Sequence, residues 1–272
     1  MADARSNRSH HIVFVHGVSH GAWCWYKLIS LLRSAGHRVT ALDLAASGID
    51  ERRFSDLRNF ADYNQPLIDL MAALPQGERI VLVSHTLGGL NIAFAMDRFP
   101  HKVAVGVFVN AFLPDTVHPP SFVYNKVQLE DPTLPLWLDT QFGTVGDKEN
   151  GPLSMVLGPK FVSLLYNRSP PEDFALAMTL LRPSSLFAKE LESSSPLSAS
   201  GYGSVAKVFI VCEKDEVLQA QASFQRWMIE NNPVNEVRVI EEADHMAMLS
   251  TPEKLSQFIS EIADKYASFI ND

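Results

Sequence analysis

Several features that would assign a protein to a class are missing from this chain. Only two of its 272 residues are cysteines, so a disulfide framework is excluded, and Cys24 and Cys212 are expected to be buried thiols. No apolar run approaches the ~18 residues that a membrane-spanning helix needs. The polar start MADARSNRSHH lacks the apolar segment of a signal peptide. We therefore expect a soluble, cytoplasmic protein with no membrane partner.

An excess of positive charge is missing as well. The chain has 31 acidic residues against 23 Lys and Arg, which gives a net charge of -8 at pH 7. Nucleic-acid binding needs clustered Lys and Arg, so no nucleic-acid partner is expected. The chain also has no glycine-rich phosphate loop and no histidines at metal-ligand spacing, so we predict neither a cofactor nor a metal.

What the chain does contain is a regular alternation of short apolar runs and amphipathic segments. Nearly all-apolar strands that alternate with helices are typical of a parallel sheet covered on both faces. Strands are expected at 11–17, 37–44, 79–84, 102–112, 206–212 and 236–244, and helices at 21–36, 60–75, 87–100, around Trp227 and at the C-terminus.

This alternation is interrupted between about Leu113 and Tyr202 by a stretch rich in proline and aromatic residues. The simplest explanation is an insertion into a single α/β domain. We predict an α/β fold, a mostly parallel sheet flanked by helices, with a core formed by residues 1–112 and 203–272 and an inserted cap formed by residues 113–202.

The stretch VLVSHTLGG, residues 81–89, has the pattern of a strand, a tight turn and a helix. Many hydrolases place a nucleophilic serine at such a turn, in the motif G-x-S-x-G. Here Ser84 replaces the first glycine and Thr86 replaces the serine. Asp215 and His245 each follow a later strand, so the order Thr86, Asp215, His245 is that of a hydrolase triad. The carboxyl ends of parallel strands lie at one edge, where these three side chains can meet.

Two backbone N–H groups complete the predicted catalytic site. Leu87 follows Thr86 directly, and Val18 lies in the loop after the first strand. Their N–H groups can form an oxyanion hole, which stabilises negative charge on a substrate oxygen. Asp244 is an alternative acid to Asp215, but it is adjacent to His245 and would have to reach around its own backbone.

These motifs resemble the plant methylesterase and hydroxynitrile lyase family of α/β-hydrolases. The similarity runs from about His11 to the C-terminus and includes HGVSHGAWCWYKL, LVSHTLGGLNIAFAMDRFP, LLRPSSLF and EEADHMAMLS. This family includes carboxyl methylesterases, polyneuridine aldehyde esterase, hydroxynitrile lyases and methylketone synthases. The resemblance implies the α/β-hydrolase fold with a cap over a small apolar pocket, a homodimer, and a role in specialised metabolism.

The resemblance also suggests which residues form the pocket. The lyases of this family have threonine where this chain has Gly17 and lysine where it has Met246, so cyanohydrin cleavage is not expected. Trp137 corresponds to a tryptophan that gates the pocket in the lyases. The remaining predicted pocket residues are His16, His20, Ser84, Phe112 and Tyr124.

The tight turn that carries the nucleophile is called the nucleophile elbow. The replacement of its serine by Thr86 leaves three hypotheses open. A β-branched residue is poorly suited to the strained elbow, so Thr86 is a poor nucleophile. The first hypothesis is non-hydrolytic chemistry, such as cyclisation or decarboxylation, in which His245 and Asp215 act as acid and base on an aldehyde, enol or ketoacid. The second is a methylesterase that uses Thr86 or an activated water. The third is a receptor for a small molecule.

Overall fold

Six apolar segments form one parallel sheet in the computed structural model, which describes residues 9–126, 137–144, 152–217 and 222–267. The strand order is β2-β1-β3-β4-β7-β8, and each neighbouring pair is parallel. All residues of β3, β4 and β7 are buried, as expected for strands covered on both faces. The strands are β1 (His11–Val15), β2 (Arg38–Leu42), β3 (Ile80–Thr86), β4 (Val103–Ala111), β7 (Lys207–Cys212) and β8 (Glu236–Ile240).

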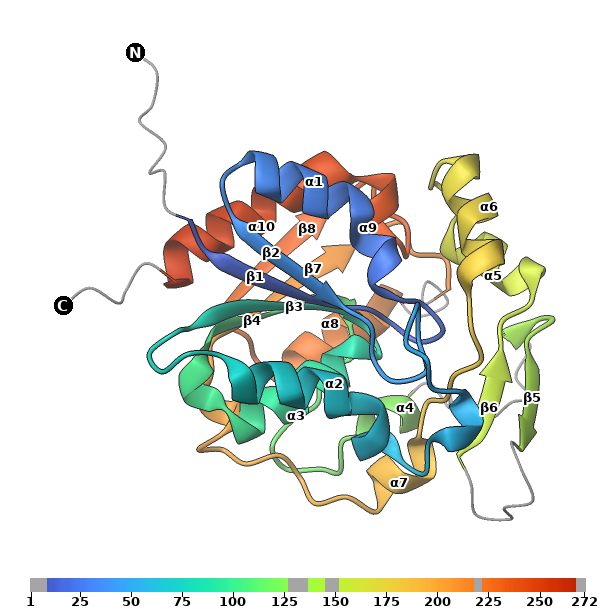
Figure 1. Cartoon of the computed structure of the whole chain (residues 1–272), viewed down its shortest axis with the longest axis horizontal. Helices are drawn as coiled ribbons and strands as arrows, with labels where there is room; N and C mark the ends of the chain where they lie inside the picture. Colours follow the sequence, from blue (N-terminus) through green and yellow to red (C-terminus); the bar gives the residue numbers. More distant parts are fainter. Residues whose placement is uncertain (1–8, 127–136, 145–151, 218–221, 268–272) are drawn as a thin grey trace.

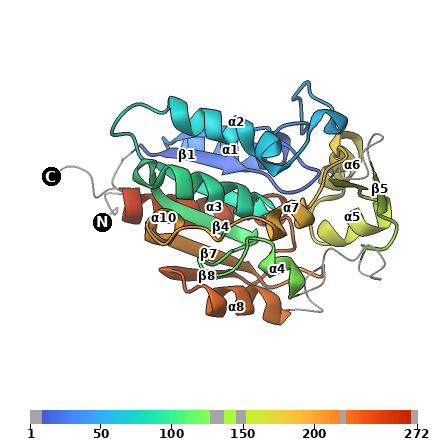
Figure 2. The same cartoon turned by 90° about the horizontal axis from the view of Figure 1, so that it is seen from below.

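Helices cover both faces of this sheet (Figures 1 and 2). One face carries α1 (Tyr26–Ser34), α9 (Ala247–Ser250) and α10 (Pro252–Ala267). The other carries α2 (Phe60–Ala73), α3 (Gly88–Arg98) and α8 (Ala222–Asn231). Short 3-10 turns are η1 (Ala22–Trp25), η2 (Phe54–Asp56), η3 (Pro100–Lys102) and η5 (Tyr202–Ser204). The predicted α/β-hydrolase architecture is confirmed.

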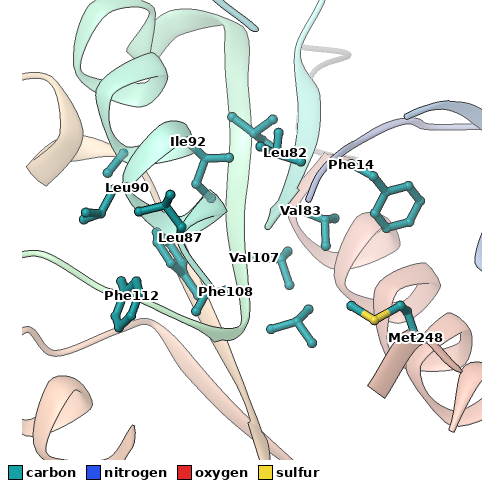
Figure 3. Packing of buried hydrophobic residues seen from close by; sticks show 14 of the residues in the cluster. Phe14, Leu82, Val83, Leu87, Leu90, Ile92, Val107, Phe108, Phe112 and Met248 are labelled. Atoms are coloured by element: carbon teal, nitrogen blue, oxygen red, sulfur yellow. The ribbon is translucent and has the colours of Figure 1, made fainter. Parts of the chain in front are cut away.

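The apolar core lies on both sides of the central strands (Figure 3). Leu90 and Ile92 of α3 lie on one side of β3 and β4, and Phe14 and Met248 lie on the other. Each such buried side chain contributes about 1.5–3 kcal/mol relative to an exposed one. Gly89 allows α3 to approach the sheet closely, because a Cβ there would lie only 2.1 Å from the carbonyl oxygen of Phe112.

The segment between β4 and β7 contains small elements that lie beyond the carboxyl ends of the strands (Figures 1 and 2). They are α4 (Phe122–Asn125), β5 (Gln141–Thr144), β6 (Leu153–Val156), α5 (Pro159–Leu165), α6 (Pro171–Leu180) and α7 (Ala188–Glu192). The antiparallel hairpin β5–β6 was not predicted. Near α7 the chain already rests on the core, because the ring of Phe187 packs against Phe60 and Tyr63 of α2. The boundaries 113 and 202 therefore stay a prediction.

The last strand is shorter than predicted. β8 ends at Ile240 rather than at residue 244, and the chain then turns back toward the site. The turn is stabilised by the carboxylate of Asp244, whose Oδ1 accepts a hydrogen bond from the N–H of Met246 over 2.9 Å. This turn brings His245 to the carboxyl edge of the sheet. In the described part of the chain, no helix is long and apolar enough to cross a membrane.

Candidate active site

Thr86 lies at the tight turn between β3 and α3, where the sequence predicted it. Its φ of +43° places a β-branched residue in the left-handed region, a strain of order 1–3 kcal/mol. The Oγ1 atom accepts a hydrogen bond from the N–H of Leu87. The neighbouring Ser84 is buried within the sheet, where its hydroxyl donates to the carbonyl of Val107 over 3.3 Å. The elbow therefore accommodates both departures from the hydrolase motif.

His245 and Asp215 lie in hydrogen-bond contact beside this elbow. The Nδ1 atom of His245 is 3.0 Å from Oδ2 of Asp215, and both side chains are buried. Because the carboxylate accepts, Nδ1 carries the proton and Nε2 presents a lone pair. Nε2 makes no hydrogen bond to any other described residue. This arrangement is that of a base oriented by a carboxylate.

Asp215 is held in its ionised form by several donors. Its Oδ2 accepts from Nδ2 of Asn110 over 2.7 Å, and its Oδ1 accepts from the N–H of Val217 over 2.9 Å. Burial alone would raise the pKa of Asp215, but its contact with His245 and these hydrogen bonds hold the pKa below its ordinary value. The carboxylate therefore remains charged at neutral pH and can stabilise a protonated His245.

Asn110 was not predicted as a site residue. It is the second-last residue of β4, has a φ of +44°, and is 1% exposed. An asparagine interrupting the apolar run 102–112 was the available signal, but no motif marks it. Its side-chain amide donates to the carboxylate of Asp215 and helps to lower the pKa of that group.

Asp244, the alternative acid, is engaged elsewhere. Its Oδ2 accepts from the N–H of Arg168 over 3.0 Å and from the hydroxyl of Ser169 over 2.9 Å. It thereby ties the cap to the turn that carries His245. The choice of Asp215 as the partner of His245 agrees with these contacts.

The two predicted oxyanion donors lie on either side of the elbow. Val18 lines the cavity, and its N–H makes no hydrogen bond within the described residues. The N–H of Leu87 is directed at Thr86 Oγ1 instead. The threonine hydroxyl therefore occupies one of the two donors that an ester carbonyl would need.

Val18, Thr86 and His245 border a largely apolar cavity. Of the predicted pocket residues, His20, Phe112 and Trp137 line it, together with Val18, Thr86 and His245. Its other walls were not predicted, because they come from cap leucines and from segments without a motif. These walls include Leu157, Phe161, Leu165, Leu186, Val217 and Met228.

His16 was predicted in the pocket wall but is turned into the core. Its Nδ1–H donates to the carbonyl of Gly17 over 2.8 Å, and its Nε2 accepts from the N–H of Leu44 over 3.0 Å. Ser84 is likewise absent from the cavity wall, because its hydroxyl is used inside the sheet. Both side chains hydrogen-bond to backbone groups of the core instead of facing the cavity.

Tyr124, Met246 and Gly17 also lie outside the cavity wall. Tyr124 packs behind Phe112 with its ring edge-on and donates its hydroxyl to the carbonyl of Leu186 over 3.2 Å. Met246 is fully buried in the turn before α9. Gly17 lies beneath Thr86 rather than beside the substrate space. In the described ranges, no group of three or more His, Cys, Asp or Glu side chains is arranged to hold a metal.

Known proteins resemble this chain in sequence and in fold. Residues 12–258 match the model of the family described as "Alpha/beta hydrolase family". Methylesterase 1 of Arabidopsis thaliana is 48% identical over 265 residues, which cover 97% of this chain and 99% of that protein. The crystal structure of polyneuridine aldehyde esterase superposes with a TM-score of 0.90 at 41% identity, covering 94% of this chain and 100% of that one. Tomato methylketone synthase I, in complex with 2-tridecanone, gives a TM-score of 0.87 at 42% identity, covering 95% and 99%.

Proposed function

This chain belongs to the alpha/beta hydrolase family, with methylesterases among its close relatives, and on that premise we propose that it performs acid–base chemistry on a small carbonyl compound. In this proposal His245 and Asp215 move the proton, and Thr86 donates a hydrogen bond instead of attacking. The substrate is a neutral aldehyde or enol, and the reaction is a proton transfer or cyclisation without a covalent intermediate.

The single observation that carries the proposal is the hydrogen bond received by Thr86. In an esterase the nucleophilic hydroxyl donates to the histidine. Here Oγ1 accepts from the Leu87 N–H, and no hydrogen bond joins Thr86 to His245, although both residues are described. The hydrogen of Thr86 remains available for a substrate oxygen, and the Leu87 amide polarises it for donation.

The chemistry follows from the positions of these groups. Nε2 of His245 takes a proton from the carbon next to the carbonyl group, and the electron pair moves onto the carbonyl oxygen. That oxygen gains negative charge and accepts hydrogen bonds from the Val18 N–H and the Thr86 hydroxyl. The protonated imidazole, stabilised by Asp215, then returns its proton to the product. No bond between the enzyme and the substrate is needed.

The cavity supports a neutral substrate over a ketoacid anion. Its described lining contains neither lysine nor arginine. Burial lowers the pKa of the lining residue His20 to about 3, so this ring is uncharged at neutral pH. A carboxylate in such a cavity would lose its hydration without gaining a cation. Decarboxylation of a ketoacid is therefore less favoured than enolisation or cyclisation.

A second candidate function is hydrolysis of a small methyl ester, through Thr86 or an activated water. The 48% identity to Methylesterase 1 of Arabidopsis favours it, as do Gly17 and Met246, which resemble the esterase branch. A neutral methyl ester also suits the apolar cavity. A receptor without turnover, a homodimer and a cytoplasmic location all remain predictions.

Activity measurements on four proteins separate these candidates. We would assay the natural protein, Thr86→Ser, Thr86→Ala and His245→Ala on p-nitrophenyl acetate, on a methyl ester and on small dialdehydes. The proposal expects Thr86→Ser to retain the carbonyl activity and His245→Ala to lose at least 10²-fold of it. If Thr86→Ala abolishes the native activity and Thr86→Ser greatly raises ester turnover, the esterase function replaces it. A ligand bound in a 1:1 ratio without turnover would favour a receptor.

A further inference from the structure

His20 is held in a stack of aromatic rings at the wall of the cavity. The ring of Trp23 lies on one side, with centroids 5.4 Å apart and planes at 25°. The ring of Tyr166, which follows α5 in the cap, is stacked at 6.1 Å and 9°. His20 is 3% exposed and Tyr166 is 4% exposed, so both rings have little freedom to turn.

The hydrogen bonds of His20 determine where its proton lies. Nδ1 is 2.8 Å from the carbonyl oxygen of Val18, which can only accept, so Nδ1 carries the hydrogen. Nε2 is 2.9 Å from the hydroxyl of Tyr166. A neutral ring with its proton on Nδ1 has an acceptor at Nε2, so Tyr166 must donate. Burial raises the pKa of Tyr166 well above its ordinary value, which keeps this donor protonated.

These contacts hold the peptide that carries the Val18 N–H. In a trans peptide the C=O of Gly17 and the N–H of Val18 point in opposite directions. The Gly17 oxygen accepts from the backbone N–H of His20 over 3.3 Å and from Nδ1 of His16 over 2.8 Å. The next carbonyl, that of Val18, accepts from the His20 ring. Both carbonyl groups that flank the oxyanion donor therefore depend on the position of His20.

The cap contributes a second contact to the same loop. The backbone N–H of Arg182 donates to the carbonyl of Ser19 over 3.0 Å, and Ser19 has a φ of +62°. The loop is thus strained and is held from the cap side by Tyr166 and Arg182. Tyr166 is not part of the cavity wall, so it reaches the substrate space only through His20.

We propose that Tyr166 is a positioning residue whose hydroxyl locks neutral His20 in the Nδ1–H tautomer and so aims the Val18 N–H at the substrate oxygen. Docking of the cap then completes the oxyanion site, because the cap supplies the hydroxyl. The role rests on the proposed function, since it is the oxyanion donor that Tyr166 serves.

The first test removes only the hydroxyl, with the variant Tyr166→Phe. Deleting an oxyanion donor costs 10²–10³-fold in kcat, and loosening one should cost less, so we expect about a tenfold fall in kcat. KM should stay within about twofold, because the donor acts mainly in the transition state. Tyr202→Phe is the matched control, since its buried hydroxyl donates to the Pro114 carbonyl over 2.7 Å, away from the cavity.

A second readout does not depend on any reaction. In ¹⁵N NMR spectra of the ring nitrogens, His20 of the natural protein should carry its proton on Nδ1. Tyr166→Phe should shift the Nε2 signal of His20, whereas Tyr202→Phe should not. This measurement reports on the tautomer even if the chemistry of the site differs from the proposal.

The two experiments distinguish failure of the positioning role from failure of the proposed function. A proton on Nε2 of His20 in the natural protein overturns the positioning role. So does a Tyr166→Phe variant whose kcat matches that of the natural protein or of Tyr202→Phe, or whose loss lies in KM alone. Activity retained in His245→Ala instead overturns the proposed function, while the NMR result on His20 still stands.

Discussion

Gly17 and Thr86 lie so close that a methyl group on residue 17 would be 2.5 Å from Oγ1 of Thr86 and 3.1 Å from its Cγ2. The threonine at the elbow therefore requires glycine beneath it. The lack of a side chain at position 17 leaves room for the extra methyl group of Thr86.

We predict that Gly17→Ala displaces the Thr86 hydroxyl and lowers kcat by about tenfold, the scale expected when a donor moves by a fraction of an ångström. Gly143→Ala is the control, because the nearest atom to its Cβ would be Ser154 Oγ at 3.7 Å. In a double-mutant cycle, adding Gly17→Ala to Thr86→Ala should cause little further loss. Full additivity of the two losses would contradict a shared effect.

The buried histidines should make stability depend on pH. Burial lowers the pKa of His20 from 6.5 to about 3 and that of His11 to about 4. Between these values and 6.5 the unfolded state binds more protons, so stability is full above pH 6.5 and falls as the pH drops toward 3.

This slope can be measured by urea unfolding between pH 7.5 and 4.5. Each such histidine contributes up to about 1.4 kcal/mol per pH unit. His20→Asn should therefore give a shallower dependence of the unfolding free energy on pH, although His11 still contributes. If the unfolding free energies of the two proteins depend equally on pH, the pKa of His20 in the folded protein is not lowered.

Arg182 connects the cap to the loop after β2. Its guanidinium donates to the carbonyl oxygens of Gly48 over 3.1 Å, Asp50 over 2.7 Å and Arg52 over 2.7 Å. A lysine has a single ammonium group and cannot match this planar arrangement. We expect Arg182→Lys to lower the unfolding free energy by about 1–3 kcal/mol, the scale of a partly buried hydrogen bond made by a charged group.

Thermal unfolding provides the measurement for Arg182→Lys. Arg58→Lys is a suitable control, because its i,i+4 pair with Asp62 lies at the surface and its loss should leave Tm nearly unchanged. If both variants unfold at the same temperature as the natural protein, Arg182 does not anchor the cap.

The sequence predicted the sheet because strong local patterns encode it. Apolar runs mark β3 and β4, Thr86 is the last residue of β3, and Asp215 and His245 follow β7 and β8. The hairpin β5–β6 was missed because its strands have four residues and Leu153 and Val156 are exposed. The contact of His20 with Tyr166 joins residues 146 positions apart, and no local pattern encodes such a pairing.

Only some of the predicted pocket residues line the cavity, for a related reason. The residue types at 16, 84 and 124 suit a polar or aromatic wall, but side-chain direction depends on packing. The side chains of His16 and Ser84 hydrogen-bond to backbone groups of the core. The hydroxyl of Tyr124 donates to the backbone carbonyl of Leu186. A sequence places such residues near a site without showing which way they face.

In the proposed function His245 moves a proton without a covalent bond at Thr86, and this proton transfer can be followed by solvent exchange. An apolar aldehyde with hydrogens next to its carbonyl group is incubated in D2O with the natural protein, Thr86→Ser, Thr86→Val or His245→Gln, and deuterium uptake is followed by NMR. We predict exchange within a few-fold of the natural rate for Thr86→Ser, about tenfold slower for Thr86→Val, and at background for His245→Gln. Background exchange in the natural protein, together with an acyl adduct on Thr86 after addition of a methyl ester, would show instead that Thr86 is a nucleophile.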